Sequence, residues 1–163
     1  MSINFRDPIP GAPDFYYGEL TRSEIAIRRG IENIPNGRQV RAMEYTARTV
    51  LQPVRNEFGR INITSGFSCL ALCPFIPRGK NSNHPRGEAA DIEPDDPRIA
   101  LLDIGIFIAE NLEYRELIFE WLPWGWIHVA AREGANIGKI KIRDHKHKYT
   151  VVELDYVKRL YGV

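Results

Sequence analysis

Two short segments, well separated in the chain, carry the side chains that most restrict its fold. The segment 82–91, Ser-Asn-His-Pro-Arg-Gly-Glu-Ala-Ala-Asp, contains His84 and Asp91. The segment 126–129, Trp-Ile-His-Val, contains His128, so the two segments hold two of the four histidines of the chain. Two imidazoles and one carboxylate are a ligand set for a zinc ion that keeps one coordination position open. A fold that uses them together must bring both segments to one point.

Each of these three side chains also has an ordinary structural explanation when it is considered alone. His128 lies among apolar residues and fits a hydrogen-bonded core histidine, whereas Asp91 fits a carboxylate at the end of a strand. However, Asp91 follows two alanines and precedes Ile92, and burying a carboxylate there without a cation would be costly. Gly87 permits a sharp turn that can bring His84 and Asp91 together. The three residues together therefore favour a metal site.

Length and charge limit the classes of protein to which the chain can belong. With 163 residues it is long enough for one domain, 1–163, with a hydrophobic core. A formal net charge of +1 argues against a dedicated nucleic-acid binder. No apolar run is long enough to cross a bilayer, and the first residues lack a signal-peptide pattern. We expect a product of the cytoplasm of the producing cell, with no membrane insertion and no nucleic-acid partner.

The first part of the chain predicts an arm followed by helices. Residues 1–17 hold three of the eleven prolines, which predicts an extended N-terminal arm of about 1–19. A capping-box pattern from Thr21 to Glu24, with Gly30 as a stop, predicts a helix over 22–29. A second helix ending at Gly59 is predicted by apolar residues at helical spacing, a pattern typical of core packing: Val40, Met43, Ala47, Val50, Leu51, Val54 and Phe58.

The second part predicts a sheet. A long ordered loop is expected over 67–87, and such loops inside compact domains are usually functional. A helix is predicted over 97–111, with Ile99, Leu102, Ile106 and Ala109 facing inward. Strands are predicted at 61–64, 89–92, 116–120, 126–130, 139–143 and 148–152, the last two as a hairpin. Helices followed by a mostly antiparallel sheet indicate an α+β domain.

The metal-ligand pattern resembles the signature of a known family. Ser-x-His-x-x-Gly-x-Ala-x-Asp over 82–91, followed by Trp-x-His over 126–128, is similar to the zinc D-alanyl-D-alanine carboxypeptidase family. This family includes phage endolysins that cut the peptide stems of peptidoglycan, and it shares its fold with the Hedgehog signalling domain. The resemblance extends from Leu20 to Arg132 and includes stretches similar to phage-encoded members, at 20–24, 26–35, 51–55, 63–67 and 117–120.

The resemblance implies a Hedgehog-like α+β fold, with a central, mostly antiparallel sheet flanked by helices. It also implies one Zn²⁺ ion, with His84, Asp91 and His128 on the ligand positions. Glu120 falls on the position of the catalytic carboxylate in members that carry Ile/Leu-x-Glu shortly before Trp-x-His. Many relatives instead place the acid three residues before the second histidine, where this chain has Gly125.

Strand geometry gives an independent reason to consider Glu120. If 116–120 and 126–130 pair as a hairpin, Glu120 lies nearly opposite Trp126 and shares a face with His128. A carboxylate there could take a proton from the attacking water and deliver it to the leaving amine. The alternative is a solvated carboxylate on the sheet.

One departure from the family pattern concerns substrate binding. Relatives commonly have Ser-Gly-Tyr-Arg-Ser where this chain has Ser-Gly-Phe-Ser-Cys over 65–69, so the usual arginine is absent. That arginine polarises the substrate carbonyl or holds a carboxylate, and losing such a donor costs on the order of a hundredfold in rate. Arg78, Arg86 and Arg132 are candidates to replace it. The residues expected to contact substrate are Ser65, Ser82, Arg86 and Trp126.

Three other features of the sequence are each compatible with more than one role. Cys69 and Cys73 could form a disulfide, half of a metal site or two buried thiols, and a cytoplasmic product favours the last. The basic stretch 139–148, with His145 and His147, could bind a metal or an anionic polymer such as teichoic acid, or form a solvated hairpin tip. Three tryptophans could stack on a glycan or cap the core: Trp121, Trp124 and Trp126.

The sequence therefore predicts a zinc metallopeptidase that hydrolyses peptidoglycan stem peptides, as a phage endolysin or a virion-associated lysin acting on the cell wall. The bond is either L-Ala–D-Glu, cut by an endopeptidase, or D-Ala–D-Ala, cut by a carboxypeptidase. The missing arginine and the phage-like N-terminal half favour the endopeptidase. The alternative is a non-catalytic, zinc-containing structural or binding module of a phage virion, with other virion proteins as partners.

Overall fold

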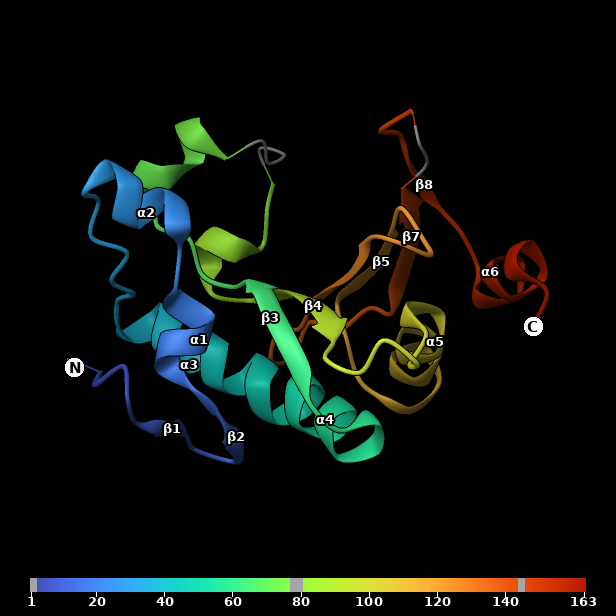
Figure 1. Cartoon of the computed structure of the whole chain (residues 1–163), viewed down its shortest axis with the longest axis horizontal. Helices are drawn as coiled ribbons and strands as arrows, with labels where there is room; N and C mark the ends of the chain where they lie inside the picture. Colours follow the sequence, from blue (N-terminus) through green and yellow to red (C-terminus); the bar gives the residue numbers. More distant parts are fainter. Residues whose placement is uncertain (1–2, 77–80, 144–145) are drawn as a thin grey trace.

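The chain folds around a six-stranded sheet with helices packed on it (Figure 1). The computed structural model describes residues 3–76, 81–143 and 146–163. The strand order in the sheet is β3-β4-β6-β5-β7-β8, and β5 pairs with β7 in parallel while the other neighbours are antiparallel. This architecture confirms the α+β prediction with a mostly antiparallel sheet.

The N-terminal residues form a small hairpin and two short helices. Strands β1 (Pro8–Ile9) and β2 (Ala12–Tyr16) pair antiparallel, and α1 (Tyr17–Thr21) and α2 (Glu24–Arg29) follow. The predicted helix over 22–29 therefore begins two residues late. The N-cap is Ser23, whose hydroxyl accepts from the Ala26 N–H, whereas the Thr21 hydroxyl donates to the Tyr17 carbonyl within α1.

The predicted long helix is confirmed as three consecutive helical segments. They are α3 (Gly37–Thr46), a π-helical turn η1 (Ala47–Leu51) and α4 (Gln52–Phe58). Asn36 caps its start by accepting from the N–H groups of Arg38 and Gln39, and Gly59 ends it with a φ of 78°. Six of the seven predicted apolar positions are buried and the seventh, Phe58, is partly buried against the same core.

The predicted strands are confirmed. They are β3 (Ile61–Ser65), β4 (Ala89–Pro94), β5 (Glu116–Glu120), β6 (Trp126–Ala130), β7 (Lys139–Arg143) and β8 (Tyr149–Val151). The described residues of the long loop between β3 and β4, 66–76 and 81–88, contain two 3-10 turns, η2 (Leu70–Phe75) and η3 (His84–Arg86).

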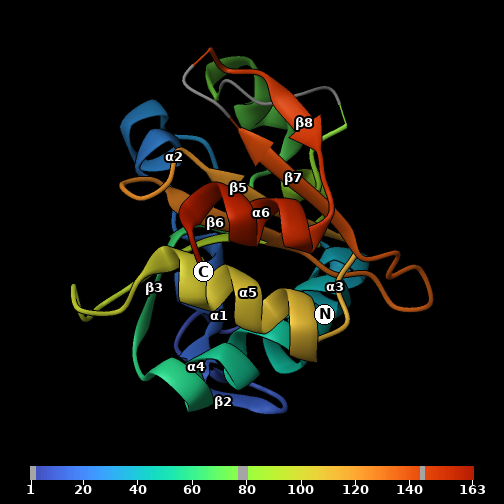
Figure 2. The ribbon, with the colours of Figure 1, turned by 90° about the vertical axis from the view of Figure 1, so that its right-hand side faces the viewer.

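Two helices differ from the sequence-based expectation. Helix α5 (Leu101–Asn111) begins four residues late, and its fully buried side is Leu101, Ile104, Gly105 and Ile108. Of the predicted set, Ile99, Leu102 and Ala109 are partly buried against the same core. The predicted inward face is offset because α5 carries apolar residues on nearly all sides, which leaves the periodicity without a clear inward face. Helix α6 (Leu154–Tyr161) was not predicted, and Val157 is its one buried residue. It lies beside α5, tied by the Lys158–Glu110 ion pair (Figure 2).

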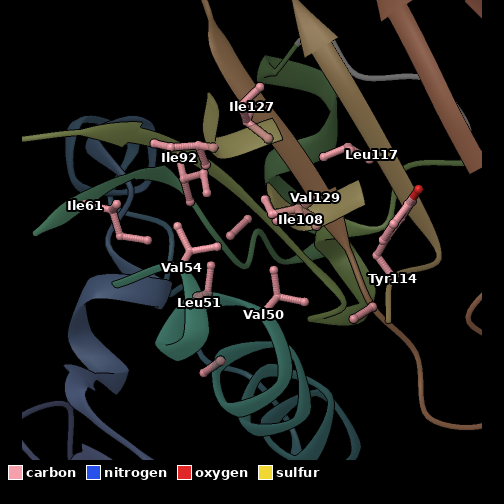
Figure 3. Packing of buried hydrophobic residues seen from close by; sticks show 14 of the residues in the cluster. Val50, Leu51, Val54, Ile61, Ile92, Ile108, Tyr114, Leu117, Ile127 and Val129 are labelled. Carbon is pink, nitrogen blue, oxygen red and sulfur yellow. The ribbon is translucent and has the colours of Figure 1, made fainter. Parts of the chain in front are cut away.

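The two faces of the sheet differ in chemistry because side chains alternate along each strand. One face, with Ile92, Leu117, Ile127 and Val129, packs against Val50, Leu51 and Val54 of the long helix (Figure 3). The opposite face carries most of the polar residues that the sequence singled out. No helix in the part of the chain that the structure describes has the length and hydrophobicity needed to span a membrane.

Candidate metal centre

The three predicted metal-ligand residues converge at one point on the polar face of the sheet. The β4–β6 register places Asp91 directly opposite His128, and η3 brings His84 over them. Asp91 Oδ1 lies 2.7 Å from His128 Nδ1 and 3.3 Å from His84 Nε2. The two imidazole nitrogens are 3.2 Å apart, and one ligand atom from each residue lies within 4.8 Å of the others. A single ion could therefore contact all three.

His84 is held in an orientation that suits metal binding. Its Nδ1 lies 2.7 Å from the carbonyl oxygen of Gly66, and the residue is 3% exposed. A carbonyl oxygen can only accept, so Nδ1 carries the proton and Nε2 presents its lone pair to the other two ligands. Gly66 has no room for a side chain, because a Cβ there would lie 2.2 Å from the Leu20 carbonyl oxygen. The glycine after Ser65 thus places the carbonyl that orients His84.

Asp91 is kept ionised by its neighbours. Burial alone would raise the pKa of this carboxyl group, but protons on the ring nitrogens of His128 and His84 that face it, with the charges they bring, hold it below its usual value. A metal ion at this point would replace those protons and leave both nitrogens with lone pairs directed at the ion. An anionic carboxylate beside two imidazoles is a donor set that fits zinc. The residues present therefore match the ion that the sequence predicted.

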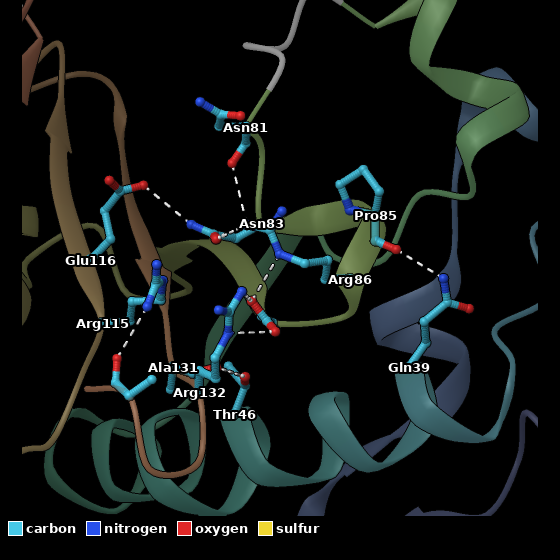
Figure 4. A network of polar contacts seen from close by, with 12 residues as sticks. Gln39, Thr46, Asn81, Asn83, Pro85, Arg86, Arg115, Glu116, Ala131 and Arg132 are labelled. Carbon is cyan, nitrogen blue, oxygen red and sulfur yellow. Dashed lines mark hydrogen bonds and ion pairs between the residues drawn. The ribbon is translucent and has the colours of Figure 1, made fainter. Parts of the chain in front are cut away.

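The turn between His84 and Asp91 is fixed by two further interactions. Gly87 has a φ of 76°, and a Cβ there would lie 2.5 Å from the Gln39 carbonyl oxygen. Glu88 is buried and forms ion pairs with Arg86, at 3.1 Å, and with Arg132, at 2.6 Å (Figure 4). Two of the three arginines considered as replacements for the missing one are thus engaged by Glu88. The third, Arg78, lies outside the described residues.

Glu120 lies on the same face of the sheet as the His-Asp-His group. It is paired with Trp126 across β5 and β6, while Ile118, two residues earlier on β5, is paired with His128. The Glu120 residue is 4% exposed, so it is not a solvated carboxylate. It accepts from Arg143 Nη1 at 3.0 Å and from the Tyr149 hydroxyl at 3.2 Å.

Arg143, which belongs to the basic stretch 139–148, and Tyr149 are neighbours of Glu120 that the sequence did not connect with it. The Arg143 guanidinium stacks over the rings of Trp121 and Tyr149, 4.3 and 4.9 Å from their centroids, and contacts His147. Burial and the Glu120 charge raise the pKa of Tyr149, so its phenol stays protonated and donates. The alternating pattern of the strand does indicate that Lys139, Lys141 and Arg143 share one face of β7. Which residues of β5 they meet depends on the parallel β5–β7 pairing, which the sequence does not reveal.

The other residues that the sequence singled out are the expected substrate contacts, the tryptophans, the cysteines and the basic stretch. Ser65 is paired with Asp91 in the β3–β4 register, and Ser82 is half-buried two residues before His84. Trp126 packs edge-to-face against Trp121, with ring centroids 5.0 Å apart, whereas Trp124 is 93% exposed. Cys69 and Cys73 are free thiols, both half-buried, and His145 of the basic stretch lies outside the described residues.

Comparison with known proteins agrees with this geometry. A Peptidase M15 family model matches residues 13–129, a range that contains the His-Asp-His group and Glu120. The chain belongs to the peptidase M15 family. Comparison with curated proteins found no match. Family membership confirms the resemblance and makes the chain a zinc-dependent metallopeptidase, in agreement with the donor set described above. Strands β7 and β8 and helix α6 follow the matched range.

Proposed function

We propose that this peptidase hydrolyses peptidoglycan stem peptides, with His84, Asp91 and His128 as the zinc ligands and Glu120 as the catalytic acid and base. The observation that carries the proposal is the placement of a buried carboxylate on the same sheet face as a convergent His-Asp-His group. The substrate class is supported by the similarity to phage-encoded members of the family. We further propose a phage lysin that reaches the cell wall from the producing cell or the virion.

The side chains of the centre have separable tasks in this proposal. Zinc, when bound, supplies Lewis acidity that activates water and polarises the scissile amide. Glu120 accepts a proton from the attacking water and returns it to the amine that leaves. Arg143 and Tyr149 hold the Glu120 carboxylate by two donated hydrogen bonds, which fixes where that proton transfer takes place.

The test uses the purified chain with zinc and isolated sacculi, with mass spectrometry of the released fragments. Glu120→Gln should keep stoichiometric zinc and lose about 10²–10⁴ of the hydrolysis rate, since it retains shape but not proton transfer. His84→Ala should lose the zinc as well. Glu110→Gln, which breaks only a surface ion pair on α5, is the matched control. Zinc-loaded protein that releases no stem-peptide fragments would contradict the proposal.

The fragment masses also decide which bond is cut. Cleavage between L-Ala and D-Glu frees the stem peptide from the glycan, whereas D-Ala–D-Ala cleavage releases one alanine. We favour the endopeptidase, because the arginine expected after Ser65-Gly66-Phe67 is absent and Arg86 and Arg132 are engaged by Glu88.

The absence of the usual arginine after Phe67 also motivates a second candidate function, a non-catalytic zinc module of a phage virion that binds other virion proteins. This alternative predicts stoichiometric zinc and a loss of thermal stability on chelation, without hydrolysis of sacculi. Hydrolysis that disappears in Glu120→Gln would exclude it.

A further inference from the structure

A second carboxylate on β5, Glu116, faces the metal centre from the side opposite to Asp91. Its Oε1 lies 3.8 Å from Nε2 of His128, the ring nitrogen that does not face the other ligands. The same oxygen accepts from the Asn83 side-chain amide at 3.2 Å (Figure 4). The other oxygen accepts from Lys141 of β7. Glu116 thus joins the histidine-bearing strand β6, the segment before His84 and strand β7.

The contact between Glu116 and His128 matters because an imidazole that binds a metal through one nitrogen carries a proton on the other. Nδ1 of His128 is the nitrogen near Asp91 and His84, so its lone pair must point to the metal and Nε2 must carry the proton. Histidines that bind metals usually direct their second N–H at a carboxylate or a carbonyl, which fixes the ring. His84 has the Gly66 carbonyl in this role. His128 has Glu116.

We propose that Glu116 is a positioning residue that attracts the Nε2–H of His128 and holds the ring with Nδ1 toward the zinc site. A separation of 3.8 Å is longer than a direct hydrogen bond, so the interaction is charge attraction across a short gap. The inference rests on the zinc site of the proposed function and deepens it. The other oxygen of Glu116 forms an ion pair with Lys141, which fixes the carboxylate beside this ring.

Asn83 extends the effect of Glu116 to the other histidine. Its side-chain oxygen accepts from Arg86, and its carbonyl oxygen accepts from the N–H groups of Arg86 and Glu88. The amide that binds Glu116 is therefore part of the turn that carries His84. One carboxylate aligns both imidazoles relative to each other.

The two carboxylates of β5 then have different tasks and different cations. Glu116 is paired with Lys141 and faces His128, whereas Glu120 is paired with Arg143 and Tyr149. Removing Glu116 should weaken zinc binding, while removing Glu120 should affect the reaction and not the ion. This difference is the basis of the test.

Zinc affinity is measured by competition with a chromophoric chelator, without any substrate. Glu116→Ala should weaken zinc binding about 10–100-fold, the usual effect of losing such a partner. Glu116→Gln keeps the shape of the side chain but removes its charge, and it should lose most of the same affinity because the contact at 3.8 Å acts through charge. Glu120→Ala, which removes the other carboxylate of the same strand face, is the matched control and should leave the zinc affinity unchanged.

A second readout follows the imidazole itself. In zinc-loaded protein with ¹⁵N-labelled histidine, the Nε2–H proton of His128 should be protected from exchange with water. In Glu116→Ala that proton should exchange faster. A role limited to charge balance with Lys141 would not change this signal.

Each outcome separates the inference from the proposed function. Unaltered protein that binds no zinc would overturn both. Zinc binding that Glu116→Ala leaves within twofold, with the Nε2–H still protected, would overturn the inference alone. A Glu116→Gln variant that keeps the original zinc affinity would also overturn it, because that variant has lost the charge. If Glu116→Ala does not fold, Glu116→Leu combined with Lys141→Met removes the acceptor without leaving a lone buried ammonium, and should show the same loss of affinity.

Discussion

Glu120 and Arg143 form a largely buried ion pair next to the metal centre, with side chains 6% and 19% exposed. Burying two charges is expensive, and their attraction offsets this cost only when both partners are present. The Tyr149 hydroxyl satisfies the second oxygen of Glu120, and two aromatic rings cover the guanidinium. The pair is therefore expected to fix the position of the carboxylate more than to stabilise the fold.

Arg143→Met tests this expectation by leaving the Glu120 carboxylate buried without its cation. We expect a loss of about 3–5 kcal/mol in the free energy of unfolding, measured by urea denaturation. Combining Arg143→Met with Glu120→Gln should recover most of that loss, because no lone charge remains. Arg22→Met, which breaks the exposed Arg22–Glu24 pair, should change stability by less than about 1 kcal/mol. A similar cost for Arg143→Met and Arg22→Met would contradict the argument.

At the scale of elements, α5 and β5 approach each other so closely at one position of α5 that only glycine fits there. Gly105 of α5 faces the ring of Phe119, and a Cβ there would lie 2.2 Å from Cε1. Phe119 is 1% exposed and its surroundings are filled, so the ring cannot move away freely. Gly37, at the start of α3, has open space instead, with the nearest atom 3.8 Å from a Cβ.

Alanine at these two positions should have opposite effects. Gly105→Ala should destabilise the protein by about 1–3 kcal/mol, since overpacking outweighs the gain in helix propensity. Gly37→Ala should be neutral or stabilising by up to about 1 kcal/mol, because only the propensity gain applies. Thermal or urea unfolding of both variants measures the difference. Equal stability changes at the two positions would contradict the close approach of α5 to β5.

The same elements show what could be predicted from the sequence. Alternation predicted β5 and β6 and even the Glu120–Trp126 pairing, because a hairpin determines its own register. The inward face of α5 was not predictable, since its surroundings come from strands elsewhere in the chain. Glu116 was missed for a similar reason: its partners Lys141 and Asn83 reach it through a parallel pairing and a loop, neither of which leaves a local pattern.

Over the whole molecule, the apolar core under the long helix and α5 lies on one face of the sheet, and the His-Asp-His group lies on the other. The apolar face is held by the long helix and α5, while His84, Asp91 and His128 join the β3–β4 loop to β4 and β6 on the other face. In its described residues, 66–76 and 81–88, the β3–β4 loop has few backbone hydrogen bonds beyond its 3-10 turns, so the position of these residues over the sheet depends on contacts such as those of Glu88 and His84. A zinc ion bound by all three residues would add a direct link between the loop and the sheet.

Zinc should therefore stabilise the folded chain by an amount that rises with the logarithm of its concentration above Kd. An ion that binds only the folded state adds RT ln(1 + [Zn]/Kd), about 2.7 kcal/mol at a hundred times Kd, which is about 5–10 °C in melting temperature for a domain of this size. A chelator should reverse the gain, and amide hydrogen exchange in residues 82–88 should slow when zinc is present. His84→Ala should melt at the same temperature with and without zinc, because one ligand of the centre is missing. A zinc-dependent rise in that variant equal to the rise in the unaltered protein would place the ion elsewhere, for example on the thiols of Cys69 and Cys73.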